Sequence, residues 1–314
     1  IDLNGHVITT NRSGNDNRFI INNGTLTMRD SEASGGAIQY YGTSETSNHY
    51  MLENNKNLTI ESGTYMNIHT SQNPGNIITG ENSTTEISGG GLTVIKTDNA
   101  GGKVDNIYAY DGGNVTISGG SLYAAGESDG STVYAVNIRN GGHKAVTLAI
   151  TGGELSAQGS NIYFDNTDGN VATSTARIRG NVEFSADDIS IYYALPTTDF
   201  IVESGKFTGM TKGIQMTTGR LVLGTEETIP SVVNPEVIGG IQLTVPMVFN
   251  GGISKAGTIA DTISTTSTIT TPDSYEVFHG EDGAYQTAYL HQLEVDEATA
   301  MIMTRSEERR VGKE

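Results

Sequence analysis

A short phrase recurs along the chain: an apolar residue, a few small polar residues with glycine, and a second apolar residue five positions after the first. The copies are Ile60–Tyr65, Ile87–Leu92, Ile117–Leu122, Ile150–Leu155 and Val202–Phe207. Apolar and polar residues alternate around them, which is the pattern of a β-strand with one buried side. A fixed local spacing that returns at a longer interval predicts a solenoid, in which each copy is one coil stacked on the previous one.

The longer interval indicates the kind of solenoid. The first apolar residues of successive coils are Met28, Ile60, Ile87, Ile117, Ile150, Ile178 and Val202, at intervals of 32, 27, 30, 33, 28 and 24 residues. About thirty residues suffice for three short strands and their turns, one coil of a parallel β-helix. We therefore expect an all-β parallel β-helix in which these residues form one buried file.

The pattern weakens near Gly224, which divides the chain into segments. Residues 1–224 are expected to form the β-helix coils. Residues 225–304 hold four of the six prolines, and the Gly-Gly pair survives only at Gly239-Gly240 and Gly251-Gly252. Proline interrupts the pairing of inner strands. This segment is expected to be β-rich and irregular, as either terminal coils or a small separate β-domain.

The last ten residues, 305–314, read RSEERRVGKE. They resemble the translation of a common sequencing-library adapter. This resemblance implies a non-native tail on a metagenomic reading frame, with the natural protein truncated at both ends. We therefore expect signal and anchoring segments to lie outside this sequence.

Composition excludes several classes of function. The formal net charge is −18, from 36 acidic and 18 basic residues, so a nucleic acid would be repelled. Cysteine is absent, which excludes disulfides, thiolate catalysis and cysteine-type zinc sites. No apolar run approaches the ~20 residues of a membrane span. The apolar content of 35% fits the thin core of a solenoid.

Two segments carry a family resemblance. Asp2–Ile8 resembles the first coil of many bacterial right-handed β-helix proteins, and Leu26–Ser31 resembles the stretch that follows it there. With the Thr-Ile-Ser-Gly-Gly phrases, the likeness covers roughly residues 1–224. It implies a right-handed, pectate-lyase-like single-stranded β-solenoid from the repeat region of a secreted or surface protein of gut bacteria. Adhesion and glycan binding are the functions usually suggested for such proteins.

An enzymatic alternative rests on acidic residues. Asn166-Thr167-Asp168 followed by Asp187-Asp188 resembles the first two motifs of the polygalacturonase family. There such carboxylates act as general acid and as base on water. The family's later histidine motif has no counterpart, because no histidine occurs between His143 and His279. The alternative is a polysaccharide-active enzyme, polygalacturonase-like or lyase-like, using Asp168, Asp187 and Asp188; solvated turns are the simpler interpretation.

The six histidines show no paired ligand spacing, so zinc is not expected. Asp165, Asn166, Asp168 and Asn170 form an oxygen-rich loop of the kind that Ca²⁺ accepts, although it fits neither standard calcium motif. Calcium is the one cofactor left open, with a surface turn as the alternative.

Tyrosine supplies the candidate ligand contacts. Tyr108, Tyr110, Tyr123 and Tyr134 fall in neighbouring coils, as do Tyr163, Tyr192 and Tyr193. Exposed stacked tyrosines offer a platform for sugar rings, and half-buried columns pack in the same way without a ligand.

The whole pattern favours a non-catalytic, extracellular or cell-surface bacterial β-helix. It would act in adhesion or glycan binding, or as a structural stalk, and its partner would be a glycan or a host surface protein. The oligomeric state and the identity of the ligand are not encoded in any motif of the chain.

Overall fold

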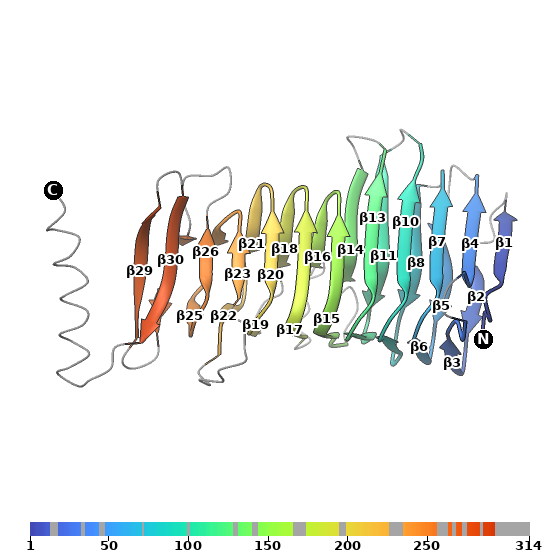
Figure 1. Ribbon diagram of the computed structural model, residues 1–314, viewed down its shortest axis with the longest axis horizontal. Helices are drawn as coiled ribbons and strands as arrows, with labels where there is room; N and C mark the ends of the chain where they lie inside the picture. Colours follow the sequence, from blue (N-terminus) through green and yellow to red (C-terminus); the bar gives the residue numbers. More distant parts are fainter. Residues whose placement is uncertain are drawn as a thin grey trace, which may run out of the picture.

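The computed structural model describes residues 1–12, 18–32, 35–43, 48–70, 72–98, 101–127, 131–139, 144–165, 174–194, 199–225, 235–255, 263–265, 268–271, 275–282 and 285–292. Regular structure within these ranges is strand only, and the strands stack into an elongated parallel β-solenoid (Figure 1). The all-β solenoid expected from the repeated phrase is confirmed. A helix long and apolar enough to span a membrane does not occur in the described ranges.

Each coil contributes a strand to each of three faces. The first face contains β3 (Thr25–Met28), β6 (Asn57–Ile60), β9 (Thr84–Ile87), β12 (Asn114–Ile117), β19 (Asp199–Val202), β22 (Arg220–Leu223), β25 (Met247–Phe249) and β28 (Ile269–Thr270). The second face contains β1 (Val7–Arg12), β4 (Ala37–Gly42), β7 (Thr64–His69), β10 (Gly91–Lys96), β13 (Ser121–Gly126), β20 (Lys206–Gly209), β23 (Glu236–Ile238) and β26 (Ile253–Lys255). Two long strands, β15 (Thr147–Ala157) and β17 (Thr175–Ala186), run through the corner and belong to both faces.

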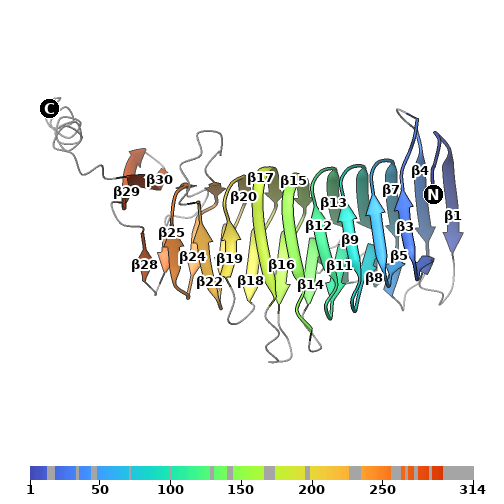
Figure 2. The same cartoon turned by 90° about the horizontal axis from the view of Figure 1, so that it is seen from below.

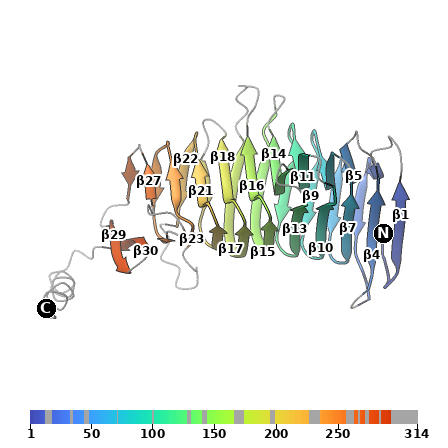
Figure 3. The same ribbon diagram turned by 90° about the horizontal axis from the view of Figure 1, so that it is seen from above.

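The third face is a separate ten-stranded parallel sheet. It contains β2 (Arg18–Asn22), β5 (Asn48–Asn54), β8 (Asn73–Thr79), β11 (Gly102–Tyr110), β14 (Ser131–Arg139), β16 (Ser160–Asp165), β18 (Ile189–Ala194), β21 (Lys212–Met216), β24 (Ile241–Leu243) and β27 (Ile263–Thr265). The stack is seen from below in Figure 2 and from above in Figure 3, where β14, β16, β18 and β21 lie side by side.

The predicted apolar file is present on the first face. The strand register pairs Met28 with Ile60, Ile60 with Ile87, and so on through Ile117, Ile150, Ile178 and Val202. All seven side chains are at most 2% exposed. The file continues to Leu223 and Phe249. A core only one coil wide is therefore closed by vertical stacking of equivalent side chains.

Glycines turn the chain between the first and second faces. Gly90 and Gly120 both have φ of +83°, a conformation that side-chain-bearing residues rarely adopt. The turns also bond from coil to coil: the Ser121 N–H donates to the Gly90 oxygen at 2.9 Å. The recurrence of Gly-Gly in the sequence thus reflects both the turn and the close approach of neighbouring coils.

The parallel stack extends beyond Gly224. β22 pairs with β25, and β25 pairs with β28, all in parallel. A hairpin of β29 (Tyr275–Asp282) and β30 (Tyr285–Gln292) follows, and β30 pairs antiparallel with β26. Strands β23 to β28 therefore add further coils, and the antiparallel hairpin lies against β26 of the second face.

Candidate ligand-binding face

Six tyrosines lie on the outer side of the third face. Tyr108, Tyr163 and Tyr192 each stand between two fully buried neighbours, such as Ile162 and Phe164 around Tyr163. Because side chains of a strand alternate, the tyrosines point outward. Tyr50, Tyr110 and Tyr134, on β5, β11 and β14, stack against these rings, and Tyr50 and Tyr134 are themselves buried. We call this set the tyrosine face: Tyr50, Tyr108, Tyr110, Tyr134, Tyr163 and Tyr192.

The rings of the tyrosine face form two stacks. Tyr134 and Tyr163 have ring centroids 4.5 Å apart, and Tyr163 and Tyr192 are 4.9 Å apart with only 11° between their planes. In the other stack, Tyr108 lies 5.6 Å from Tyr110 and 6.3 Å from Tyr50. Since the ring faces are turned toward one another, the outer surface offers mainly ring edges and phenol groups.

Polar groups lie among the rings. The Tyr50 hydroxyl donates a 2.9 Å hydrogen bond to the Asp105 carboxylate, which also accepts one from Asn137 at 2.9 Å. Arg18 lies 5.3 Å above the Tyr50 ring and forms a 2.9 Å ion pair with Glu53. Arg18 and Glu53 compensate each other, and the positive charges of Lys103 and Arg139 favour the charged form of Asp105.

Burial raises the pKa of several phenols of the tyrosine face. It raises the pKa of Tyr108 and Tyr110, and it raises the pKa of Tyr134 to about 12. The pKa of Tyr163 is also raised, by burial and by the nearby Asp165. A neutral phenol both donates and accepts hydrogen bonds, as the hydroxyl groups of a sugar do.

The structure separates the four tyrosines that the sequence placed together. Tyr108, Tyr110 and Tyr134 share the tyrosine face, and Tyr134 is only 8% exposed. Tyr123 lies on β13 of the second face, where it pairs with Thr93 and is 39% exposed. The sequence placed these tyrosines in neighbouring coils, but it did not indicate on which of the three faces each one lies.

The acidic residues of the enzymatic alternative form no observed constellation. Asp187 and Asp188 lie exposed in the turn between β17 and β18, and their N–H groups donate to the oxygens of Ala157 and Gly159. Asp168 falls outside the described residues. Asp187 and Asp188 therefore have a structural role, because they form a turn that is hydrogen-bonded to the preceding coil.

The calcium candidates are only partly described. Asp165 ends β16, and its carboxylate accepts a 3.3 Å hydrogen bond from the Tyr163 hydroxyl. Asn166, Asp168 and Asn170 lie outside the described residues. Among the described residues, no group of three or more histidine, aspartate or glutamate side chains is arranged to hold a metal ion.

A buried basic cluster escaped the sequence analysis. His49 and His69, twenty positions apart, stack inside the coils with ring centroids 4.2 Å apart, and both are fully buried. Burial lowers the pKa of His49 and lowers that of His69 to about 4. Lys96 is also fully buried and forms an ion pair with Asp98. These groups lie in the interior and do not contribute to the outer faces.

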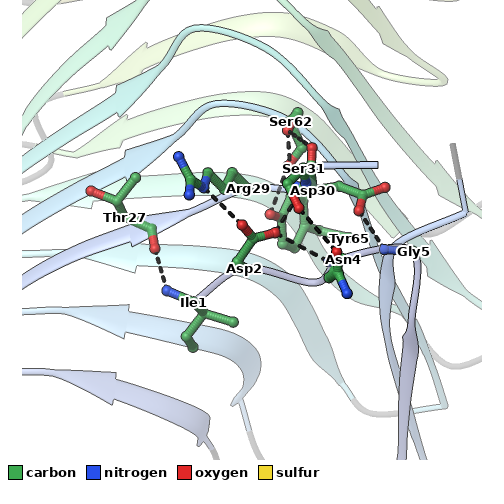
Figure 4. Close-up of polar contacts among 10 residues, drawn as sticks. All are labelled: Ile1, Asp2, Asn4, Gly5, Thr27, Arg29, Asp30, Ser31, Ser62 and Tyr65. Atoms are coloured by element: carbon green, nitrogen blue, oxygen red, sulfur yellow. Dashed lines mark hydrogen bonds and ion pairs between the residues drawn. The ribbon is translucent and has the colours of Figure 1, made fainter. Parts of the chain in front are cut away.

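A second polar group organises the first coil (Figure 4). The Asp30 carboxylate accepts hydrogen bonds from the N–H of Gly5 at 2.7 Å and of Gly36 at 2.8 Å. The Gly5 bond is the main cause of a lowered pKa of Asp30. Asp2 accepts a 3.0 Å hydrogen bond from Arg29. These carboxylates are engaged by the chain itself, so their role is to join the turns of the first coil to the strand that follows.

Comparison of the chain with protein-family models, with curated proteins and with solved structures finds no match in any of the three. The functional conclusion therefore rests on the faces of the solenoid. Of these, the tyrosine face gathers the largest set of outward, neutral, hydrogen-bonding side chains described above.

Proposed function

We propose that this chain is the non-catalytic β-helical part of an extracellular or cell-surface bacterial protein, and that it binds a glycan through the tyrosine face. The proposal takes its cellular setting from the sequence resemblance of residues 1–224 to bacterial surface repeats. It takes its binding site from the geometry of the third face.

One observation carries the proposal. The register aligns Tyr108, Asn137, Tyr163, Tyr192, Gln215 and Gln242 in a single file, one residue per coil. Asn137 is buried at 1% exposure and donates to Asp105, so the ligand-facing groups are the three tyrosines and the two glutamines. Neighbouring strands of a sheet are ~4.8 Å apart, so the file extends over roughly 24 Å. A straight row of uncharged donors and acceptors at regular spacing suits an extended polymer whose hydroxyl groups also repeat.

Charge narrows the class of glycan. The net charge of −18 disfavours a strongly anionic polysaccharide. The phenols and amides of the file carry no charge, and the charges of Arg18 and Glu53 compensate each other. A neutral glycan chain is therefore the ligand that this face supports best.

The experiment measures binding of purified neutral glycans by calorimetry to the wild-type chain and to a Tyr163→Phe, Tyr192→Phe double variant. Phenylalanine keeps the ring stack and removes only the two hydroxyl groups. We expect affinity to fall about tenfold, because each lost hydrogen bond contributes about 0.5–1.5 kcal/mol. Tyr123→Phe, the same change on the second face, should leave binding unaltered.

Equal loss in the Tyr123→Phe control, or full binding by the double variant, would exclude the tyrosine face as the site. A separate assay tests the claim that the chain is not an enzyme, by measuring the release of reducing ends from the same glycans. Turnover that disappears in Asp187→Asn or Asp188→Asn would show an enzyme instead. Antibody labelling of intact cells carrying the full-length gene tests the surface location.

A further inference from the structure

The second face carries a pocket of its own at the carboxyl ends of β1, β4, β7 and β10, strands that lie side by side in Figure 1. Its volume is about 330 Å³, at the lower end of the range that small-molecule sites occupy. The lining consists of hydroxyl, amide and apolar groups from Asn11, Tyr41, Gly42, Thr43, Ile68, Thr70 and Thr97.

The coil repeat positions this lining. Asn11, Tyr41 and Ile68 are register partners on β1, β4 and β7, so they form one outer file. Thr70 and Thr97 continue the pairing beyond the strand ends, where the Thr70 N–H donates to the Gly42 oxygen at 3.2 Å. The Thr97 N–H donates to the His69 oxygen at 3.1 Å. Backbone bonds between coils therefore hold the threonines one coil apart, ~4.8 Å.

The described residues that line the pocket are uncharged. None of the seven lining residues carries a charge, although the protein has a net charge of −18. The Tyr41 ring and the Ile68 side chain supply apolar contacts, and three threonine hydroxyls supply donors and acceptors. Gly42 lines the pocket with backbone atoms only, because a side chain at this position would point inward and collide with the buried His69 imidazole. Among these seven residues, an anion or a cation would lose hydration without meeting an opposite charge.

We propose that this pocket binds one neutral sugar unit, with its C–H groups against Tyr41 and Ile68 and its hydroxyls bonded to Thr43, Thr70 and Thr97. The inference goes beyond the proposed function, because the pocket lies on a different face from the tyrosine file and shares no residue with it. A free monosaccharide and the end of a glycan chain present the same chemistry to this site.

The test titrates neutral methyl hexosides and, separately, neutral oligosaccharides into the isotope-labelled chain, and follows the amide signals of Thr70 and Thr97 by NMR. Glucuronate serves as the charged counterpart. We expect saturable shifts with neutral hexosides and at least about tenfold weaker binding of glucuronate. Binding of hexosides alone identifies a monosaccharide site, and tighter binding of oligosaccharides identifies a chain-end site.

Thr70→Val removes one hydroxyl at nearly constant shape and should weaken binding roughly fivefold. Thr116→Val makes the same change on the first face and should leave binding unchanged, as should the Tyr163→Phe, Tyr192→Phe variant. Three results would contradict the proposal that this pocket binds a neutral sugar. They are the absence of saturable shifts, equal or tighter binding of glucuronate, and undiminished binding by Thr70→Val. None of these results alters the test of the tyrosine face.

Discussion

The Tyr50 hydroxyl and the Asp105 carboxylate, 55 residues apart in sequence, are joined by a 2.9 Å hydrogen bond that passes over an intervening coil. In the register, Gly75 stands between them. A side chain at Gly75 would collide with the Tyr50 ring and with the backbone oxygen of Asp105. The bond therefore depends on a glycine that leaves room for the ring.

The first prediction concerns this bond. Burial already raises the pKa of Asp105, and Tyr50 is one of the groups that counter this by stabilising the carboxylate. Tyr50→Phe should raise that pKa further and lower the free energy of unfolding at pH 7 by about 1–3 kcal/mol. The loss should be smaller well below pH 3.8, where the carboxyl is protonated in both the folded and the unfolded chain. Denaturant unfolding at both pH values measures it; Tyr110→Phe serves as control, and an equal loss there would contradict the specific bond.

The second prediction tests the buried file. Ile117 is fully buried between Ile87 and Ile150. Ile117→Ala should lower the free energy of unfolding by about 2–5 kcal/mol, because neighbouring coils cannot close the cavity. Its neighbour Thr116 faces outward and is half-buried, so Thr116→Ala should cost less than about 1 kcal/mol. Urea unfolding of both variants provides the comparison, and similar losses would mean that the file is not the core.

The third prediction uses adjacent glycines as a matched pair. Gly90 has φ of +83°, and an added Cβ would lie 2.8 Å from the Gly63 oxygen. Gly91 has no such φ, and its Cβ would find the Ser121 Oγ at 3.5 Å, an ordinary contact. Gly90→Ala should therefore cost at least about 1–2 kcal/mol. Gly91→Ala should be nearly neutral in the same thermal unfolding experiment; the reverse order would refute the turn geometry.

The fourth prediction concerns pH. The pKa of His69 is lowered from 6.5 to about 4 by burial and by the neighbouring His49. The unfolded chain then binds more protons between these values, so stability is complete above pH 6.5 and falls as the pH approaches 4. The loss should reach about 3 kcal/mol when titration is complete. Unfolding midpoints from pH 4 to pH 8 should show this slope in the wild-type chain and a reduced slope in His69→Gln. An unchanged slope would assign the effect to other groups.

The coiled architecture could be predicted because the spacing of apolar residues within each coil is regular. The five-residue interval in Ile117–Leu122 joins one buried position on the first face to one on the second, and the strand register bears this out at Ile87, Ile117 and Ile150. The terminal coils were harder to predict, because strands such as Glu236–Ile238 are only three residues long and the repeated phrase survives there only as a Gly-Gly pair. Their pairing depends on the preceding coils and not on their own pattern.

The candidate sites could be predicted only in part. The sequence showed that tyrosines recur, but loop lengths determine which face receives each one, and these vary from coil to coil. Tyr123 therefore fell on the second face, and Tyr50 was overlooked. The contact of His49 with His69 and the alignment of Thr70 with Thr97 arise from stacking between coils, which no spacing within one coil reveals.

Because each coil touches chiefly the coils before and after it, a whole coil is the natural unit of insertion or deletion in this protein. Gain or loss of about thirty residues in register would preserve every remaining contact along the files. Length can thus change by duplication while both ends of the rod keep their chemistry. We would then expect homologues to differ in solenoid length by whole numbers of coils.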